Sequence, residues 1–189
     1  MPDNSLKPQS ALAGYDRQFD GVTLQELTGL SLVSIAVPMG GRDELARATE
    51  SVFGVTLPDV GSSIYSEAGR IRLLGLQRDQ LFLAIEYQGD DAVALTRGKL
   101  GNAGYYTDQS DSWAMLRIAG PGCRRALNRI CMLNLDSNTF AIGTVSRTTM
   151  EHLAVIILRD GPDSFLLLSP RSSARSFLHA VERSIINTA

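Results

Sequence analysis

Two stretches of the chain open in the same way, and this partial repeat limits the fold more than any other feature. Residues 35–59 and 118–136 both begin with Ile-Ala-x-Pro, continue into a helix-like segment and close in a turn that contains Leu and Asp. Strand patterns precede and follow each stretch. The chain therefore reads twice as strand, helix, strand, strand, helix, which predicts two related lobes.

The hydrophobic pattern sets the expected bounds of these elements. In the first half a loop is predicted at 55–69, where Pro, Gly and Ser are frequent. The first half is expected to have strands at 30–38, 70–77 and 80–87 and helices at 40–54 and 90–104. The second half is expected to have strands at 113–120, 141–150, 151–160 and 164–170 and helices at 121–131 and 171–189.

These patterns predict an α+β fold whose two lobes have mainly antiparallel sheets covered by helices. Residues 1–20 are polar with scattered apolar positions and predict an N-terminal arm. Residues 21–189 then form one compact domain, with lobes at about 21–106 and 107–189. The strands at 151–160 and 164–170 are apolar on both faces, so helices of the lobes or a partner subunit must cover each side.

Composition excludes several classes of protein. The net charge of −2 gives no general attraction to nucleic acids or anionic membranes. The first residues are polar, without the apolar core of a signal peptide, and no apolar run approaches the length of a membrane span. We therefore expect a cytoplasmic protein that binds neither nucleic acid nor membrane.

The residues that usually carry chemistry are scarce. The chain has two histidines, His152 and His179, and their spacing is not that of a metal site. No Gly-x-Ser-x-Gly elbow is present, and the acids Asp108 and Asp111 lie in a stretch typical of a turn. The sequence therefore predicts no catalytic, cofactor-binding or metal-binding residue.

The segment 117–136 allows several interpretations. Its Gly-Pro-Gly turn could hold a phosphate, but no Lys follows and proline has no N–H to donate, so a plain strand-to-helix joint is favoured. On the expected helix Cys123 and Cys131 are separated by a rise of about 12 Å, too far for a disulfide, and both fall on the apolar face. Arg124, Arg125 and Arg129 form a basic face that is either solvated surface or a contact with an acidic partner.

A series of short motifs resembles one family, the gamma subunits of heterotetrameric sarcosine oxidase. The matching positions are Thr107-Asp108, Ser110, Gly120-Pro121, Leu133-Asn134-Leu135, Phe140, Gly143, Thr148, Arg171-Ser172 and Phe177. The first half agrees more loosely, at Gly54 and Leu57-Pro58, with Gln77 and Phe82 where the family usually has proline and tryptophan. The resemblance covers residues 50–187 approximately and rests on the order of the motifs.

The resemblance implies a duplicated α+β fold, similar to the folate-binding domain of the glycine-cleavage T-protein. It also implies a complex that demethylates sarcosine to glycine, transfers the one-carbon unit to tetrahydrofolate and forms H2O2. In such a complex FAD, FMN, NAD and tetrahydrofolate are held by other subunits, the delta subunit holds zinc, and the gamma subunit has no catalytic residue. The partners are then the larger alpha, beta and delta subunits, and Trp113, Arg124, Arg125 and Arg129 are the candidate contacts.

Three alternatives stay open at the level of the sequence. The chain is a stand-alone folate-binding protein of the T-protein superfamily, a gamma-like subunit of a related N-methyl amino acid dehydrogenase, or a general interaction module. Full aminomethyltransferases are longer than 189 residues, which weighs against the first of these.

Overall fold

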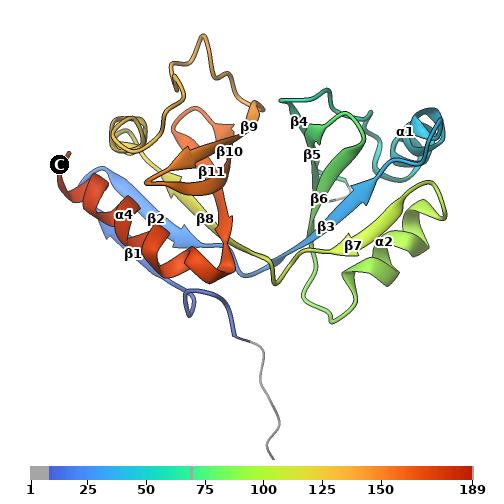
Figure 1. The fold of residues 1–189 in the computed structure, drawn as a ribbon, viewed down its shortest axis with the longest axis horizontal. Helices are drawn as coiled ribbons and strands as arrows, with labels where there is room; N and C mark the ends of the chain where they lie inside the picture. The colour runs from blue at the N-terminus through green and yellow to red at the C-terminus, as the bar shows by residue number, and fades with distance from the viewer. Residues whose placement is uncertain (1–8, 69, 189) are drawn as a thin grey trace, which may run out of the picture.

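The computed structural model describes residues 9–68 and 70–188, and its helices and strands form four layers (Figure 1). Two antiparallel sheets face each other in the middle, and helices cover the outer face of each sheet. This arrangement confirms the predicted α+β class with helix-covered antiparallel sheets. No helix in the described residues is long and apolar enough to cross a bilayer.

The first lobe has the predicted order of elements with one added strand. It contains β3 (Leu30–Ala36), α1 (Arg42–Phe53), β4 (Ser63–Ser66), β5 (Ile71–Gln77), β6 (Gln80–Glu86) and α2 (Ala92–Leu100). Because β4 lies inside the segment predicted as a loop at 55–69, that prediction is wrong over these four residues. Residues 63–66 are too few and too exposed to show an apolar alternation, so their pairing with β5, and not their sequence pattern, identifies them as a strand.

The second lobe repeats this order. It contains β8 (Trp113–Ala119), α3 (Cys123–Leu127), β9 (Val145–Met150), β10 (Leu153–Gly161), β11 (Ser164–Pro170), a single turn η1 (Arg171–Ser173) and α4 (Ala174–Ile186). The helix predicted at 121–131 is therefore wrong beyond Leu127. There the chain changes to tighter turns, such as Arg129 N–H to the Ala126 carbonyl, and Cys131 then forms an isolated bridge with Met150.

Each sheet includes strands from the chain segment that precedes the other lobe, β1 (Asp16–Phe19) and β2 (Val22–Glu26) in the second-lobe sheet and β7 (Tyr105–Asp108) in the first-lobe sheet. Strand β2 comes just before β3 but pairs with β8, whereas β7 comes just before β8 but pairs with β3. The resulting strand orders are β1-β2-β8-β11-β10-β9 and β4-β5-β6-β3-β7. The lobe boundary expected between 106 and 107 thus falls inside β7, and residues 22–26 pair with the second-lobe sheet.

The strands that are apolar on both faces are covered within the chain. On β10, Val155 and Ile157 pack toward α3 and α4, whereas Ile156 and Leu158 pack against the sheet of the first lobe. The cluster between the sheets is almost entirely aliphatic, with Phe82 as its buried aromatic residue. Helices therefore cover one face of these strands, and the sheet of the first lobe covers the opposite face.

The segment predicted as an N-terminal arm contains β1 (Asp16–Phe19), which pairs with β2, so the prediction of an arm over 1–20 is wrong from residue 16. Residues 1–8 lie outside the described part of the chain. Before β1 the buried Glu26 carboxylate accepts hydrogen bonds from the Ser10 hydroxyl at 2.8 Å and from the N–H groups of Leu12 at 3.0 Å and Gly14 at 2.8 Å. Sequence pattern alone does not reveal this tether, because two of its three donors are backbone groups.

Candidate interaction surface

The β1–β2 hairpin packs against the Gly-Pro-Gly turn at the start of α3. Gly122 N–H donates to the Gly21 carbonyl at 3.2 Å, and a Cβ atom on Gly120 would lie 2.4 Å from that same oxygen. Gly120 has φ +114°, a conformation that other residues rarely adopt. The turn is thus a close backbone contact, which favours the interpretation as a structural joint over a phosphate-binding loop.

The three arginines predicted as a basic face separate into two neighbouring places. Arg124 and Arg125 line a shallow hollow of about 420 Å³ together with Asn128 and Asp163. Arg125 is exposed, whereas Arg124 is half-buried, and its Nε atom is buried without a hydrogen-bond partner among the described residues. The third arginine, Arg129, follows α3 and faces α4 instead.

Arg129 lines a groove of about 500 Å³ between the turn after α3, the β9–β10 turn and α4. The groove contains apolar residues, among them Ile130 and Leu153, and its basic groups include Arg183, with Glu151 as the only acidic residue that lines it in the described part of the chain. An apolar surface flanked by arginines binds acidic segments of proteins well, because guanidinium groups pair with carboxylates in a bidentate way. The basic surface predicted on α3 therefore extends onto α4.

Trp113 lies away from these arginines. It is half-buried on the face of β8 that is turned toward the other sheet, where its ring meets Phe82 edge-on at a centroid distance of 6.1 Å. It also lines a hollow of about 540 Å³ next to the segment that crosses between the lobes. The four predicted contact residues thus do not form one surface, since α3 packs on the opposite face of β8.

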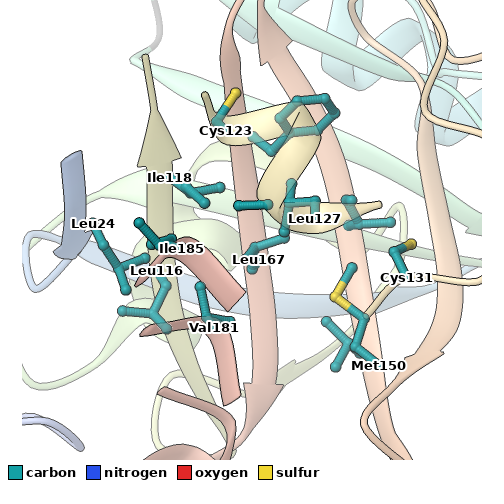
Figure 2. Packing of buried hydrophobic residues seen from close by; sticks show 14 of the residues in the cluster. Leu24, Leu116, Ile118, Cys123, Leu127, Cys131, Met150, Leu167, Val181 and Ile185 are labelled. Carbon is teal, nitrogen blue, oxygen red and sulfur yellow. The ribbon is translucent and has the colours of Figure 1, made fainter. Parts of the chain in front are cut away.

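Both cysteines are buried free thiols in the cluster beneath α3 and α4 (Figure 2). Burial raises the pKa of the Cys123 thiol to about 11, and the negative charge of Asp163 adds to the effect. Burial also raises the pKa of the Cys131 thiol. A thiol with a raised pKa is a poor nucleophile near neutral pH, so the two cysteines act here as small apolar residues, as predicted.

The histidines do not form a site. His152 and His179 are both exposed, and His152 lies in the two-residue turn between β9 and β10, with φ +67°. Within residues 9–68 and 70–188 no group of three His, Cys, Asp or Glu side chains is arranged to hold a metal ion.

Two features of the structure have no signal in the sequence. The hollow beside Trp113 is lined by acidic residues from distant segments, Glu26, Asp90, Asp108 and Asp111, and by one base, Arg171. Glu26 comes from β2 and Asp108 from β7, the strands that pair with the sheet of the other lobe, and Arg171 pairs with Asp111 at 3.4 Å.

The buried Arg159 is the second such feature. Its guanidinium donates to the carbonyl groups of Phe140 at 2.9 Å, Gly161 at 3.2 Å and Pro162 at 2.6 Å. The side chain is 4 % exposed, so it joins two loops from inside the second lobe. The sequence does not reveal this role of Arg159, because its three hydrogen-bond acceptors are backbone oxygens.

Comparison with known proteins gives consistent relatives in sequence and in structure, although no family model matches the chain. It is 30 % identical to sarcosine oxidase subunit gamma of Corynebacterium sp. strain P-1, over 80 % of this chain and 73 % of that protein. A chain of the heterotetrameric sarcosine oxidase from Corynebacterium sp. U-96, solved with pyrrole 2-carboxylate, superposes with a TM-score of 0.75 at 26 % identity, over 88 % of this chain and 85 % of that one. Aminomethyltransferase T of Bartonella henselae shares the fold, with a TM-score of 0.62 at 16 % identity, over 85 % of this chain and 45 % of that one.

Proposed function

Because the chain belongs to the family of sarcosine oxidase gamma subunits, we propose that it is the gamma subunit of a cytoplasmic heterotetrameric sarcosine oxidase. The observation that carries this proposal is the 30 % identity, which spans 73 % of the curated relative. In the proposed complex the chain assembles with larger alpha and beta subunits and a delta subunit. The complex oxidises sarcosine to glycine, transfers the one-carbon unit to tetrahydrofolate and forms H2O2.

The chain's proposed part in this reaction is structural. FAD, FMN, NAD and tetrahydrofolate are held by the other subunits, and this chain has neither a cofactor nor a catalytic residue. The buried thiols, whose pKa values are raised, support the proposal, and so does the exposure of both histidines.

The basic surface on α3 and α4 is the proposed contact with an acidic region of a partner subunit. Arg125 and Arg129 are exposed, and Arg129 lines a groove with an apolar part, as expected of a contact that combines charge with buried area. Arg124 contributes from its half-buried position. Trp113 would meet a partner only at the acidic hollow, which is a separate place on the molecule.

Co-expression of the tagged chain with its candidate partner subunits tests the proposal. The chain should co-purify with larger flavin-containing subunits, and the complex should oxidise sarcosine with formation of H2O2, whereas the isolated chain should be folded and inactive. Circular dichroism of the isolated chain is the control for folding. A folded chain that captures no flavoprotein would contradict the proposal.

Two further measurements separate this proposal from its alternatives. Calorimetric titration of the isolated chain with tetrahydrofolate should show no micromolar binding, and the acidic lining of the hollow beside Trp113 is unfavourable for an anionic ligand of that kind. Micromolar binding would favour a stand-alone folate-binding protein. Rates of the assembled complex with sarcosine and with other N-methyl amino acids would show whether it is instead a related dehydrogenase.

A further inference from the structure

The two sheets differ by one strand at equivalent positions. In the second-lobe sheet β8 is followed outward by β2 and then by β1, whereas in the first-lobe sheet β3 is followed by β7 and the sheet ends there. Strands β2 and β7 are equivalent, since each precedes one lobe in the chain and pairs antiparallel with the first strand of the other. The internal duplication thus marks a position beside β7 that no described strand of the chain fills (Figure 1).

The backbone of β7 presents hydrogen-bonding groups toward this position. Gln109 N–H donates to the Leu32 carbonyl of β3 at 2.7 Å. Since hydrogen-bonded pairs alternate along an antiparallel ladder, Thr107 is the next residue that bonds to β3. The N–H and C=O groups of Tyr106 and Asp108 therefore point away from β3, toward the free edge.

The side chains along this edge are uncovered. Tyr105, Thr107 and Asp108 are exposed, and Tyr105 retains 69 % of its accessible surface. A free edge with an exposed aromatic residue is a common place for the addition of a strand from another chain.

We propose that an extended segment of a partner subunit adds to β7 and completes the first-lobe sheet as its sixth strand. The added strand runs antiparallel to β7 and pairs with about four residues, as β1 pairs with β2 in the sister sheet. It bonds to the backbone groups of Tyr106 and Asp108 and covers Tyr105. This inference rests on the proposed function, because the proposed complex supplies the partner.

Hydrogen exchange of the whole complex and of the isolated chain, resolved to single residues by mass spectrometry, tests the pairing directly. The amide protons of Tyr106 and Asp108 should exchange about 100-fold more slowly in the complex. The matched control is the outer edge of β1, where the amide protons of Asp16 and Gln18 should exchange at the same rate in both samples. Slow exchange at Tyr106 and Asp108 in the isolated chain already would overturn the inference, since the chain itself or a second copy would then cover the edge.

Two variants at position 108 distinguish the contribution of the backbone N–H from that of the side chain. Asp108→Pro removes an outward N–H without touching the bonds to β3, and it should weaken assembly at least about tenfold. Asp108→Ala loses the same carboxylate, which accepts from Ser110 N–H at 2.8 Å, but keeps the N–H and should assemble normally. Equal assembly of the two variants, each checked for folding by its melting temperature, would refute strand addition at β7. If the wild-type chain itself fails to assemble, the proposed function fails instead.

Discussion

The two strand-to-helix joints begin with the same Ile-Ala-x-Pro motif but have different surroundings. In the first lobe the turn after β3 is open, with Met39 fully exposed and no atom within 4 Å of the Cβ position of Gly40. In the second lobe the turn after β8 is closed by the β1–β2 hairpin, whose Gly21 carbonyl lies against Gly120 and Gly122. The turn that follows the shared motif is therefore exposed in the first lobe, whereas in the second lobe it is packed against a hairpin.

The helices after the two joints differ in a related way. Helix α1 has 12 residues and ends at Gly54 in a left-handed conformation, whereas α3 has five residues and leads into turns. Helix α1 packs Leu45 and Phe53 into the first-lobe core. Helix α3 has further tertiary contacts, such as the hydrogen bond from the Ser184 hydroxyl of α4 to the Ala126 carbonyl at 2.6 Å. The lobes thus share an order of elements, but their first helices differ in length and in how they end.

The largest expected effect comes from adding a methyl group to the closed joint. Gly120→Ala places a Cβ atom 2.4 Å from the Gly21 carbonyl oxygen at φ +114°, and should lower the free energy of unfolding by about 3 kcal/mol. The comparison change in the exposed turn of the first lobe, Gly40→Ala, adds only the strain of a positive φ, about 1 kcal/mol. Urea unfolding measures both, and equal losses would mean that the joints do not differ as described.

The next effect depends on pH. Burial raises the pKa of Cys123 from its ordinary value of 9.0 to about 11, so the folded state disfavours the thiolate. The stability that this thiol contributes is complete below pH 9 and is lost as the pH rises toward 11, with a fall of about 2 kcal/mol. The alkaline slope of unfolding free energy should be smaller in Cys123→Ala. An unchanged dependence of the unfolding free energy on pH would show that burial in the second lobe does not raise the pKa of the Cys123 thiol.

A smaller effect is expected from the tether of the N-terminal segment. Glu26→Gln weakens three hydrogen bonds to a buried carboxylate, and should cost about 1 kcal/mol. Hydrogen exchange should show faster exchange at Leu12 and Gly14, whose N–H groups donate to this carboxylate. Exchange in α1 of the other lobe should not change. If Leu12 and Gly14 keep their wild-type rates, the tether does not order this segment.

The smallest effect on stability is expected for exposed arginines on the helices. Arg125→Glu on α3 and Arg47→Glu on α1 should each change the free energy of unfolding by less than about 0.5 kcal/mol. Their effects on assembly should differ, since α3 belongs to the proposed basic contact surface and α1 does not. A salt-dependent loss of affinity for the partner subunits in Arg125→Glu alone would support that surface. Equal affinities of the two variants would argue against it.

Local pattern predicts the elements of this fold well but not their partners. The apolar runs of β3, β6 and β11 identify strands, and the apolar stripe of α4 identifies a helix, because burial of one face or both decides these segments. The pairing of β2 with β8 rather than with β3 has no local signal, since it depends on the course of the whole chain.

The candidate site shows the same limit. The sequence places Arg124, Arg125 and Arg129 near one another, and they do lie near one another because one short segment carries them. It cannot show that Trp113 points to the opposite face of β8. Nor can it show that Arg129 shares a groove with Arg183, because that contact joins residues that are far apart in the chain.

The reciprocal exchange of β2 and β7 also bears on the origin of the chain. In this pairing the strand that precedes a lobe adds to the sheet of the other lobe. A single ancestral lobe paired in this way would therefore leave its own sheet incomplete. Two identical copies can complete both sheets by swapping those strands, which is a domain-swapped dimer. Gene duplication and fusion of such a dimer would produce the connectivity seen here. After fusion the two halves need not be identical, so one sheet can have an edge strand that the other lacks.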